Sequence, residues 1–248
     1  MNPTGAGGGP REGARLGDVL ISSRPHAQYL AQFALTDADL RIGPVLDCPG
    51  GASDFTATLR GRGIAATAVD PCYGLRPAEL ALVLEAEHRR VVAWTSAQPG
   101  RFPLTADGVW EQAPSWRRTS ARFLADYTAD RREGTGRYLA AGLPALPFPD
   151  HHFALAVSGF LLFTYPEHFD TAFHLAAVSE LLRVARQVRL HPLNSTDGTP
   201  YPGLDHLLRT LHGSHPGLRH RIVPVTGQSD RRDDRTLILE HHPGPPAR

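Results

Sequence analysis

The sequence predicts a mixed α/β domain built around a mostly parallel sheet. Short apolar runs typical of buried strands alternate with longer patterns typical of helices, as in parallel-sheet α/β proteins. The last two apolar runs have no helical pattern between them, so they should pair as a hairpin and leave one antiparallel strand in the sheet. With 248 residues, 41% hydrophobic and 21% charged, the chain can build one sizeable core.

The first half of the chain shows these elements around a glycine turn. A helix-like segment at 25–33 precedes a short apolar strand at 44–47, and Ser53 can cap a helix that runs to about Arg60. Phe55 and Leu59 share one face of that helix, and the glycines at 61 and 63 end it. A second buried strand is expected at 64–69. Helices are expected at 77–90 and 116–131, with a loop at 95–114 between them.

The second half continues the alternation. A weak strand at 138–140 and a clearer one at 153–157 lead to a helix at 168–184, where Phe169, Phe173 and Leu181 lie on one side. A strand at 187–190, a helix at 204–211 and strands at 221–225 and 236–240 complete the pattern. Residues 1–15 are rich in glycine and proline, so we expect a disordered tail there and a single domain at 16–248.

Composition narrows the partners and the compartment. The formal net charge is only +1, and every basic residue is arginine, so no global field favours nucleic acid or a membrane. Arginines cluster between 117 and 137, but carboxylates interspersed with them favour a solvated helix face. Two cysteines, no long apolar run and no signal-peptide pattern predict a cytoplasmic protein without a membrane partner. Nothing in the sequence indicates an oligomeric state.

The most informative segment is VLDCPGGASDF at 45–55, which places two glycines between a strand and a helix. Parallel sheets bind ligands at this position, and Gly50 and Gly51 would let a ligand approach the backbone closely. Asp70, at the end of the second strand, can accept hydrogen bonds from both hydroxyls of a ribose. A dinucleotide loop needs G-x-G-x-x-G to seat a pyrophosphate, whereas Asp47 puts a carboxylate here, which suits an ammonium group.

Three stretches together resemble the class I S-adenosylmethionine-dependent methyltransferases, and most of all a bacterial branch of them. They are VLDCPGGASDF with AVDPCY, LPALPFPDHHFALAVSGFLLFTYPEHFD, and AAVSELLRVARQVRLHPL, and they span roughly residues 25–193. The resemblance implies a Rossmann-like fold, with a mostly parallel seven-stranded sheet, a C-terminal antiparallel hairpin strand and helices on both faces. It also implies S-adenosylmethionine as the cofactor.

The resemblance implies a cofactor role for positions along the carboxyl edge of the sheet. The methionine end would be lined by Asp47, Cys48, Pro49, Gly50 and Gly51. Asp70 would hold the ribose, and the adenine would be contacted by Pro71, Cys72, Gly142 and Leu143. The sulfonium and the acceptor would be faced by Ser158, Gly159 and Phe160. Tyr29, in a segment that resembles the family's N-terminal lid, would contact the cofactor carboxylate or the acceptor, or else pack in the core.

This chain departs from the family pattern mainly on the acceptor side. Pro49 replaces the usual first glycine of the loop, and the acid that commonly reads the adenine amine is missing near Gly142. Where related sequences often carry Ser-His after the fourth strand, this one has Ser158-Gly159. The stretch at 227–231 matches its relatives only in part. Because of these departures, the resemblance supports cofactor binding in this chain more strongly than it supports the family's substrates or catalytic base.

The sequence leaves the catalytic base open. Candidates near the fourth strand are Tyr165, His168 and His152, followed by His151 and His174, and each has a structural alternative as a capping, solvated or polar-face residue. The histidines at 212, 215, 220, 241 and 242 do not have the spacing of a metal-ligand set, so no metal is expected.

The sequence therefore predicts in-line methyl transfer to a small-molecule acceptor. Residues 73–137 form a long insertion that could wall a pocket around such an acceptor. Three alternatives remain open: a cofactor-binding protein without methylation activity, such as a regulator, partner subunit or non-methylating catalyst; a macromolecule methyltransferase; and, more distantly, a nicotinamide dehydrogenase.

Overall fold

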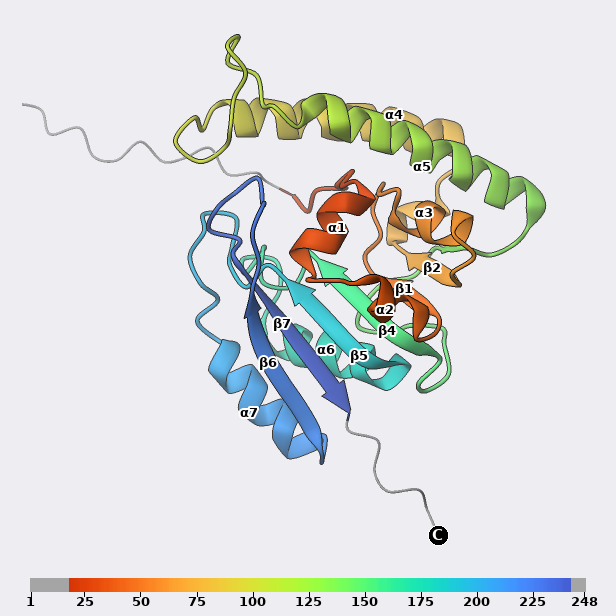
Figure 1. Cartoon of the computed structure of the whole chain (residues 1–248), viewed down its shortest axis with the longest axis vertical. Helices are drawn as coiled ribbons and strands as arrows, with labels where there is room; N and C mark the ends of the chain where they lie inside the picture. Colours follow the sequence, from red (N-terminus) through yellow and green to blue (C-terminus); the bar gives the residue numbers. More distant parts are fainter. Residues whose placement is uncertain (1–17, 242–248) are drawn as a thin grey trace, which may run out of the picture.

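The computed structural model describes residues 18–241, and the tail expected at 1–15 lies outside them. Seven strands form one sheet in the order β3-β2-β1-β4-β5-β7-β6 (Figure 1). Their bounds are β1 Val45–Asp47, β2 Ala66–Val69, β3 Tyr138–Leu139, β4 Phe153–Gly159, β5 Ala185–His191, β6 Leu218–Pro224 and β7 Arg235–His241.

The sheet is parallel except at its C-terminal end. β1 lies between β2 and β4, with Val45 opposite Ala66 on one side and Leu155 on the other. β7 runs antiparallel to both β5 and β6. This arrangement confirms the predicted α/β fold, including the hairpin formed by the last two strands.

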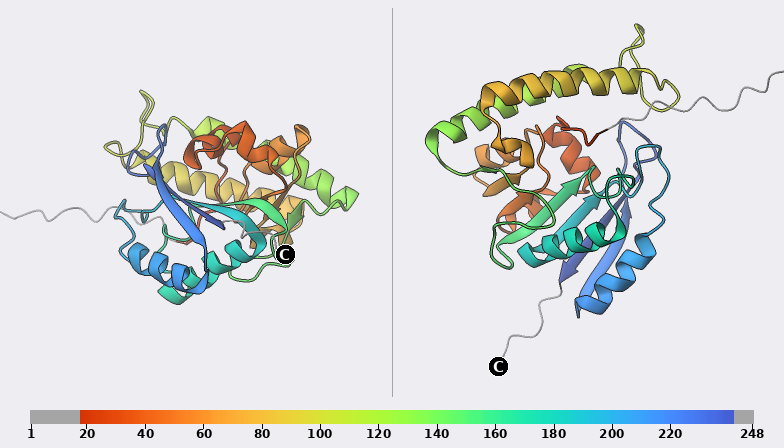
Figure 2. Two further views of the ribbon diagram at one scale, coloured as in Figure 1. Left: turned by 60° about the horizontal axis from the view of Figure 1, so that its bottom comes forward. Right: turned by 180° about the vertical axis from the view of Figure 1, so that it is seen from behind.

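The helices cover both faces of the sheet, as Figure 2 shows. Their bounds are α1 His26–Gln32, α2 Asp37–Arg41, α3 Phe55–Gly61, α4 Pro77–Ser96, α5 Ala113–Glu133, α6 Thr171–Val184 and α7 Leu204–Ser214, with a short 3₁₀ helix η1 at Pro71–Gly74. Side chains alternate along the strands, so Val45 packs toward α1 and α3 while Leu46 packs toward α6 and α7. Both layers of core are therefore built on the same short strands.

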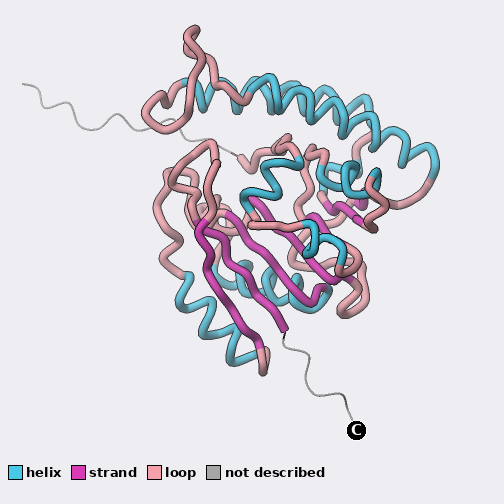
Figure 3. The backbone as a smooth tube through the Cα atoms, in the orientation of Figure 1, coloured by secondary structure: helices cyan, strands magenta, loops and turns pink. Residues whose placement is uncertain are grey.

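α4 and α5 lie side by side over the carboxyl edge of the sheet (Figures 1 and 3). α4 extends to Ser96, past the expected end at 90, because Val91 and Thr95 continue its buried face and the first helix-breaking residues come only at 99–100. The loop between the two helices is correspondingly shorter than predicted. Within residues 18–241, no helix is long and apolar enough to cross a membrane.

Two short elements were not expected from the sequence. α2 begins with a capping box in which Thr36 and Asp39 exchange hydrogen bonds. η1 begins at Asp70, whose side chain accepts the amide of Cys72. α6 begins at Thr171, capped by Asp170, so His168 precedes the helix that was predicted to start there. In α2, η1 and α6 alike, a capping side chain fixes the first residue of the helix, and the hydrophobic periodicity of the sequence does not reveal such caps.

Candidate functional site

A cavity of about 400 Å³ lies at the carboxyl ends of β1, β2 and β4. That volume is in the range of small-molecule sites, which run from about 300 to 1,000 Å³. Of the residues expected to contact the cofactor, its wall contains Cys48, Pro49, Gly51, Asp70, Pro71, Cys72, Gly142, Leu143, Gly159 and Phe160. Four others, Tyr29, Asp47, Gly50 and Ser158, do not line this cavity.

Asp70 connects the two loops at the mouth of this cavity. One carboxylate oxygen, Oδ2, accepts the amide of Gly51 at 3.0 Å, and Oδ1 accepts the amide of Cys72 at 2.9 Å. A carboxylate oxygen can accept more than one hydrogen bond, so both keep acceptor capacity toward the cavity. The position at the end of β2 thus combines a fixed carboxylate with access to a ligand.

Other atoms of the protein approach both glycines of the loop so closely that a side chain at either position would clash with them. A Cβ on Gly50 would lie 2.5 Å from the hydroxyl of Tyr73, and one on Gly51 would lie 2.8 Å from the carbonyl oxygen of Ser22. Gly51 also has a φ of +53°, which disfavours any other residue. Gly50 faces protein atoms and does not line the cavity, so its contact with a ligand stays a prediction.

Asp47 is a buried carboxyl group directly beneath the loop. Its Oδ2 accepts the hydroxyl of Ser53 at 3.2 Å, whereas Oδ1 has no hydrogen-bond partner among residues 18–241. Burial raises the pKa of Asp47 well above its usual range, and hydrogen bonds from Tyr29 and Ser53 oppose that shift. A buried, unsatisfied acceptor is costly, so this oxygen is suited to a cationic donor.

Tyr29 packs in the core, which is one of the two roles that the sequence left open. Its ring stacks on Phe55 with a centroid separation of 4.5 Å, and its hydroxyl lowers the pKa of the Asp47 carboxyl group. Tyr29 is buried and does not line either cavity. A direct contact between Tyr29 and the cofactor or the acceptor therefore stays a prediction.

The segment at 18–25 lies across the site. The carbonyl oxygen of Ser22 accepts the amide of Ala52 at 2.8 Å, which fixes the segment on the glycine loop. The amide of Leu20 donates to the hydroxyl of Tyr165 at 3.1 Å. Leu20 and Ser22 line both the first cavity and a second one beside it, so this segment separates the two.

The second cavity, of about 80 Å³, lies beneath α4 and α5. Its apolar wall includes Val91, Trp94, Phe102, Trp110, Trp116 and Phe160, and its polar wall includes Arg24, Gln28, Gln32, Thr164, Tyr165 and Asp233. Phe160 belongs to both cavities, so they meet just beyond the end of β4. Sequence reasoning missed most of this wall, because its residues come from five separate segments and form no motif.

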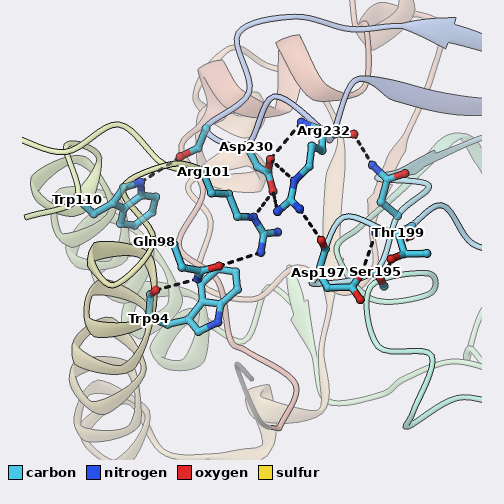
Figure 4. A network of polar contacts seen from close by, with 11 residues as sticks. Trp94, Gln98, Arg101, Trp110, Ser195, Asp197, Thr199, Asp230 and Arg232 are labelled. Atoms are coloured by element: carbon cyan, nitrogen blue, oxygen red, sulfur yellow. Dashed lines mark hydrogen bonds and ion pairs between the residues drawn. The ribbon is translucent and has the colours of Figure 1, made fainter. Parts of the chain in front are cut away.

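Polar contacts join three loops that border the second cavity, as Figure 4 shows. Arg101, just after α4, forms an ion pair with the buried carboxylate of Asp230, which also binds Arg232 at 3.1 Å. Arg232 in turn donates to the backbone oxygen of Asp197. The indole of Trp110 donates to the hydroxyl of Ser229 at 3.0 Å. We call this network the loop clasp; it joins segments 97–112, 192–203 and 225–234.

The structure separates the candidate bases. Tyr165 lines the second cavity, and burial raises its pKa. His168 is exposed and lines neither cavity. His152 and His151 precede β4 and so lie at the amino ends of the strands, whereas the site lies at their carboxyl ends. Neither histidine can therefore reach the site. The expectation of a polar-face His174 is wrong, because this residue is fully buried between the carbonyl oxygens of Asp170 and Leu162.

Two further titratable groups lie near the second cavity. Burial raises the pKa of Asp233 to about 7, with Asp230 adding to the shift and Arg101 and Arg24 opposing it. Burial lowers the pKa of His191 to about 3, so its imidazole is neutral, and its Nε2 has no partner within the described residues. Asp233 lines the cavity and His191 does not, so Asp233 is the group there that titrates near neutral pH.

No family model matches the chain. It is 27% identical over 200 residues to the uncharacterized protein MJ0045 of Methanocaldococcus jannaschii, covering 78% of this chain and 86% of that one. This relative is archaeal, so a restriction to a bacterial branch stays a prediction.

Solved structures with a similar arrangement include several methyltransferases. The N-methyltransferase NodS from Bradyrhizobium japonicum, in complex with S-adenosyl-L-homocysteine, is 12% identical with a TM-score of 0.45, covering 88% of this chain and 86% of that one. A SAM-dependent methyltransferase from Aquifex aeolicus is 15% identical with a TM-score of 0.39, covering 86% and 87%. Likenesses this distant do not assign an activity, so the chain is similar to these enzymes in arrangement only.

Proposed function

We propose that the protein is a class I S-adenosylmethionine-dependent methyltransferase that acts on a small-molecule acceptor. The observation that carries this proposal is the pair of cavities that meet at Phe160. The first is bordered by the strand-end carboxylate of Asp70 and the glycine loop, and the second is small and bordered by the loop clasp. Such a pair suits a cofactor that transfers a group to a separate, enclosed acceptor.

The residues of the first cavity fit this cofactor. Asp70 keeps acceptor capacity for ribose hydroxyls, and the unpartnered Oδ1 of Asp47 can accept a hydrogen bond from an ammonium group, directly or through a water. The apolar residues Val69, Pro71 and Leu143 offer a surface for a flat adenine ring. When bound, S-adenosylmethionine supplies an electrophilic methyl group on a sulfonium.

The chain contributes mainly orientation. In-line displacement requires the nucleophile, methyl carbon and sulfur to be aligned, and positioning of this kind supplies up to about 7–11 kcal/mol in well-oriented reactions. The segment at 18–25 and the loop clasp border the acceptor cavity and would limit the access of water to it. Asp233 can take the proton of a hydroxyl or ammonium acceptor, because its pKa of about 7 leaves part of it ionised at neutral pH.

Calorimetric titration with S-adenosylmethionine, and separately with S-adenosylhomocysteine, tests the proposal first. We expect micromolar binding of both to the wild type and a loss of at least about 30-fold in Asp70→Ala, because a charged acceptor is removed. Asp37→Ala is the matched control, since Asp37 is an exposed carboxylate that pairs with Arg62. Failure of the wild type to bind either compound, or unchanged binding in Asp70→Ala, would overturn the proposal.

One observation favours a cofactor-binding protein without methylation activity as the second candidate. A Cβ on Gly159 would lie 3.1 Å from the Phe33 ring, so no polar side chain can be placed at this position without repacking. Tight cofactor binding without turnover across a broad acceptor panel would support this alternative. A macromolecular acceptor is disfavoured by the small, closed cavity and because arginines of the 117–137 segment pair with carboxylates, as Arg117 does with Glu85.

A further inference from the structure

We propose that the second cavity binds a small planar acceptor bearing a carboxylate, and that Arg24 is the residue that binds this carboxylate. That the bound molecule is a methyl acceptor rests on the proposed function. The binding site itself follows from the cavity and the residues that line it. Arg24 is not among the site residues that the sequence predicts.

The guanidinium of Arg24 lies over two aromatic rings. Its guanidinium carbon lies 3.3 Å from the ring centroid of Phe160 and 5.1 Å from that of Trp116. Rings over a guanidinium cover its faces and leave its N–H groups available at the edge of the plane. Two parallel N–H groups at such an edge match the two oxygens of a carboxylate.

No protein group in the described part of the chain neutralises this guanidinium. Arg24 makes no ion pair or hydrogen bond with any residue of 18–241. The carboxyl group of Asp233 opposes the effect of this burial on the pKa of Arg24, but among residues 18–241 it forms no ion pair with Arg24. The other carboxylate of the cavity, Asp230, is already bound by Arg101 and Arg232. Burial lowers the pKa of Arg24 to about 10, so it stays cationic at neutral pH.

The cavity wall indicates the rest of the ligand. Its volume of about 80 Å³ corresponds to roughly six waters, at about 10–15 Å³ for each, which is the size of a single-ring molecule. Trp94, Trp110 and Trp116 line it, and aromatic walls favour a flat ring. Gln32 Nε2 and Thr164 Oγ1 also line it without a hydrogen-bond partner among residues 18–241, so they can bind a polar ring substituent.

A carboxylate at Arg24 has two possible sources: the acceptor, or the methionine moiety of the cofactor itself. The structure favours the acceptor, because Arg24 lines the second cavity and not the first. The two sources predict different losses when Arg24 is changed, so one set of titrations separates them.

The experiment is calorimetric titration with benzoate, salicylate and 4-hydroxybenzoate, and with the neutral amide of each acid. Wild type, Arg24→Gln, Arg24→Lys and the control Arg118→Gln are each titrated with and without S-adenosylhomocysteine. Arg118 is exposed on α5 and lines neither cavity. Circular dichroism melting of each variant checks that it is folded.

We expect at least one acid to bind the wild type about 30-fold or more tightly than its amide, and this preference to vanish in Arg24→Gln. Arg24→Lys should keep part of the preference, since it keeps the charge but not the planar fork. Arg118→Gln and all S-adenosylhomocysteine affinities should be unchanged.

Three results would overturn the inference: no acid preferred over its amide, a preference that survives Arg24→Gln, or an equal loss of S-adenosylhomocysteine binding in that variant. The last result would assign Arg24 to the cofactor. Arg24-dependent binding of an acid in a protein that binds no S-adenosylhomocysteine would sustain the site and reject the proposed function.

Discussion

Asp47 and Asp233 are buried carboxyl groups whose pKa values burial raises, and they differ in access. Asp47 lies behind the glycine loop and is held by Tyr29 and Ser53. Asp233 lines the acceptor cavity, where its titration near neutral pH can serve proton transfer. The same desolvation that makes Asp233 useful makes its ionised form destabilising.

Asp233→Asn should therefore stabilise the protein in a pH-dependent way. The folded pKa of about 7 lies above the unfolded value of about 3.9, so the native state binds more protons between these values. The stabilising contribution of Asp233 is full below about pH 4 and is lost as the pH rises through 7. We expect the free energy of unfolding of Asp233→Asn, relative to wild type, to rise by roughly 2–4 kcal/mol across that window.

Urea unfolding at half-unit pH steps measures this difference. Asp234→Asn is the matched control, because its exposed side chain lies next in sequence and forms an ion pair with Arg235 at 3.5 Å. A difference between Asp233→Asn and wild type that does not change between pH 4 and 8 would contradict the raised pKa.

At the scale of elements, the acceptor cavity depends on loops that belong to no single motif. α4, α5 and the loop between them supply most of its aromatic wall, and the loop clasp joins that loop to the loops that follow β5 and β6. Removal of one partner of a buried ion pair such as Arg101–Asp230 strongly destabilises the surrounding structure, because the other charge is left buried and unpaired.

Arg101→Ala should open this clasp while leaving the sheet intact. Hydrogen exchange measured by mass spectrometry should show faster exchange in segments 97–112 and 225–234, by about 10-fold or more, with no change in α6. Arg76→Ala removes an exposed pair with Glu79 and should leave both segments unchanged. Equal exchange in the Arg101→Ala variant and wild type would show that the ion pair does not hold the loops.

At the scale of the whole molecule, Arg189 connects the middle of the sheet to the N-terminal layer. Its guanidinium, 2% exposed, donates to the carbonyl oxygens of Phe33 at 3.0 Å and Ala34 at 2.6 Å and to Asp39 at 2.6 Å. Ala34 has a φ of +50°, an unfavourable conformation for a residue with a Cβ. These contacts fix the turn between α1 and α2 and so position Tyr29 above Asp47.

Arg189→Met should lower the free energy of unfolding by about 3–5 kcal/mol, since it leaves a carboxylate and two carbonyl groups without their donor. For a chain of this size that is a fall in Tm of roughly 6–20 °C, measurable by differential scanning calorimetry. Arg221→Met is the control, because its ion pair with Glu240 is exposed and should contribute less than about 1 kcal/mol. A fall in Tm no larger than that of the control would contradict the connecting role.

The sequence by itself determined the fold class and the framework of the first cavity. Period-two and period-3.6 patterns report which faces are buried, so the strand order along the chain and most helices could be predicted. Asp47, the glycine pair and Asp70 lie at strand ends, and parallel strands bring such positions to one edge of the sheet. These are local signals, or consequences of topology alone.

Only the tertiary structure decided the acceptor cavity and what the loop glycines contact. Arg24, Trp116, Phe160 and Asp233 are far apart in the sequence, and no pattern indicates that they share one wall. Gly50 and Gly51 are required by a hydroxyl and a carbonyl group that arrive from η1 and from the segment at 18–25. Contacts between distant segments depend on how whole layers pack, and for that reason periodicity and spacing could not predict them.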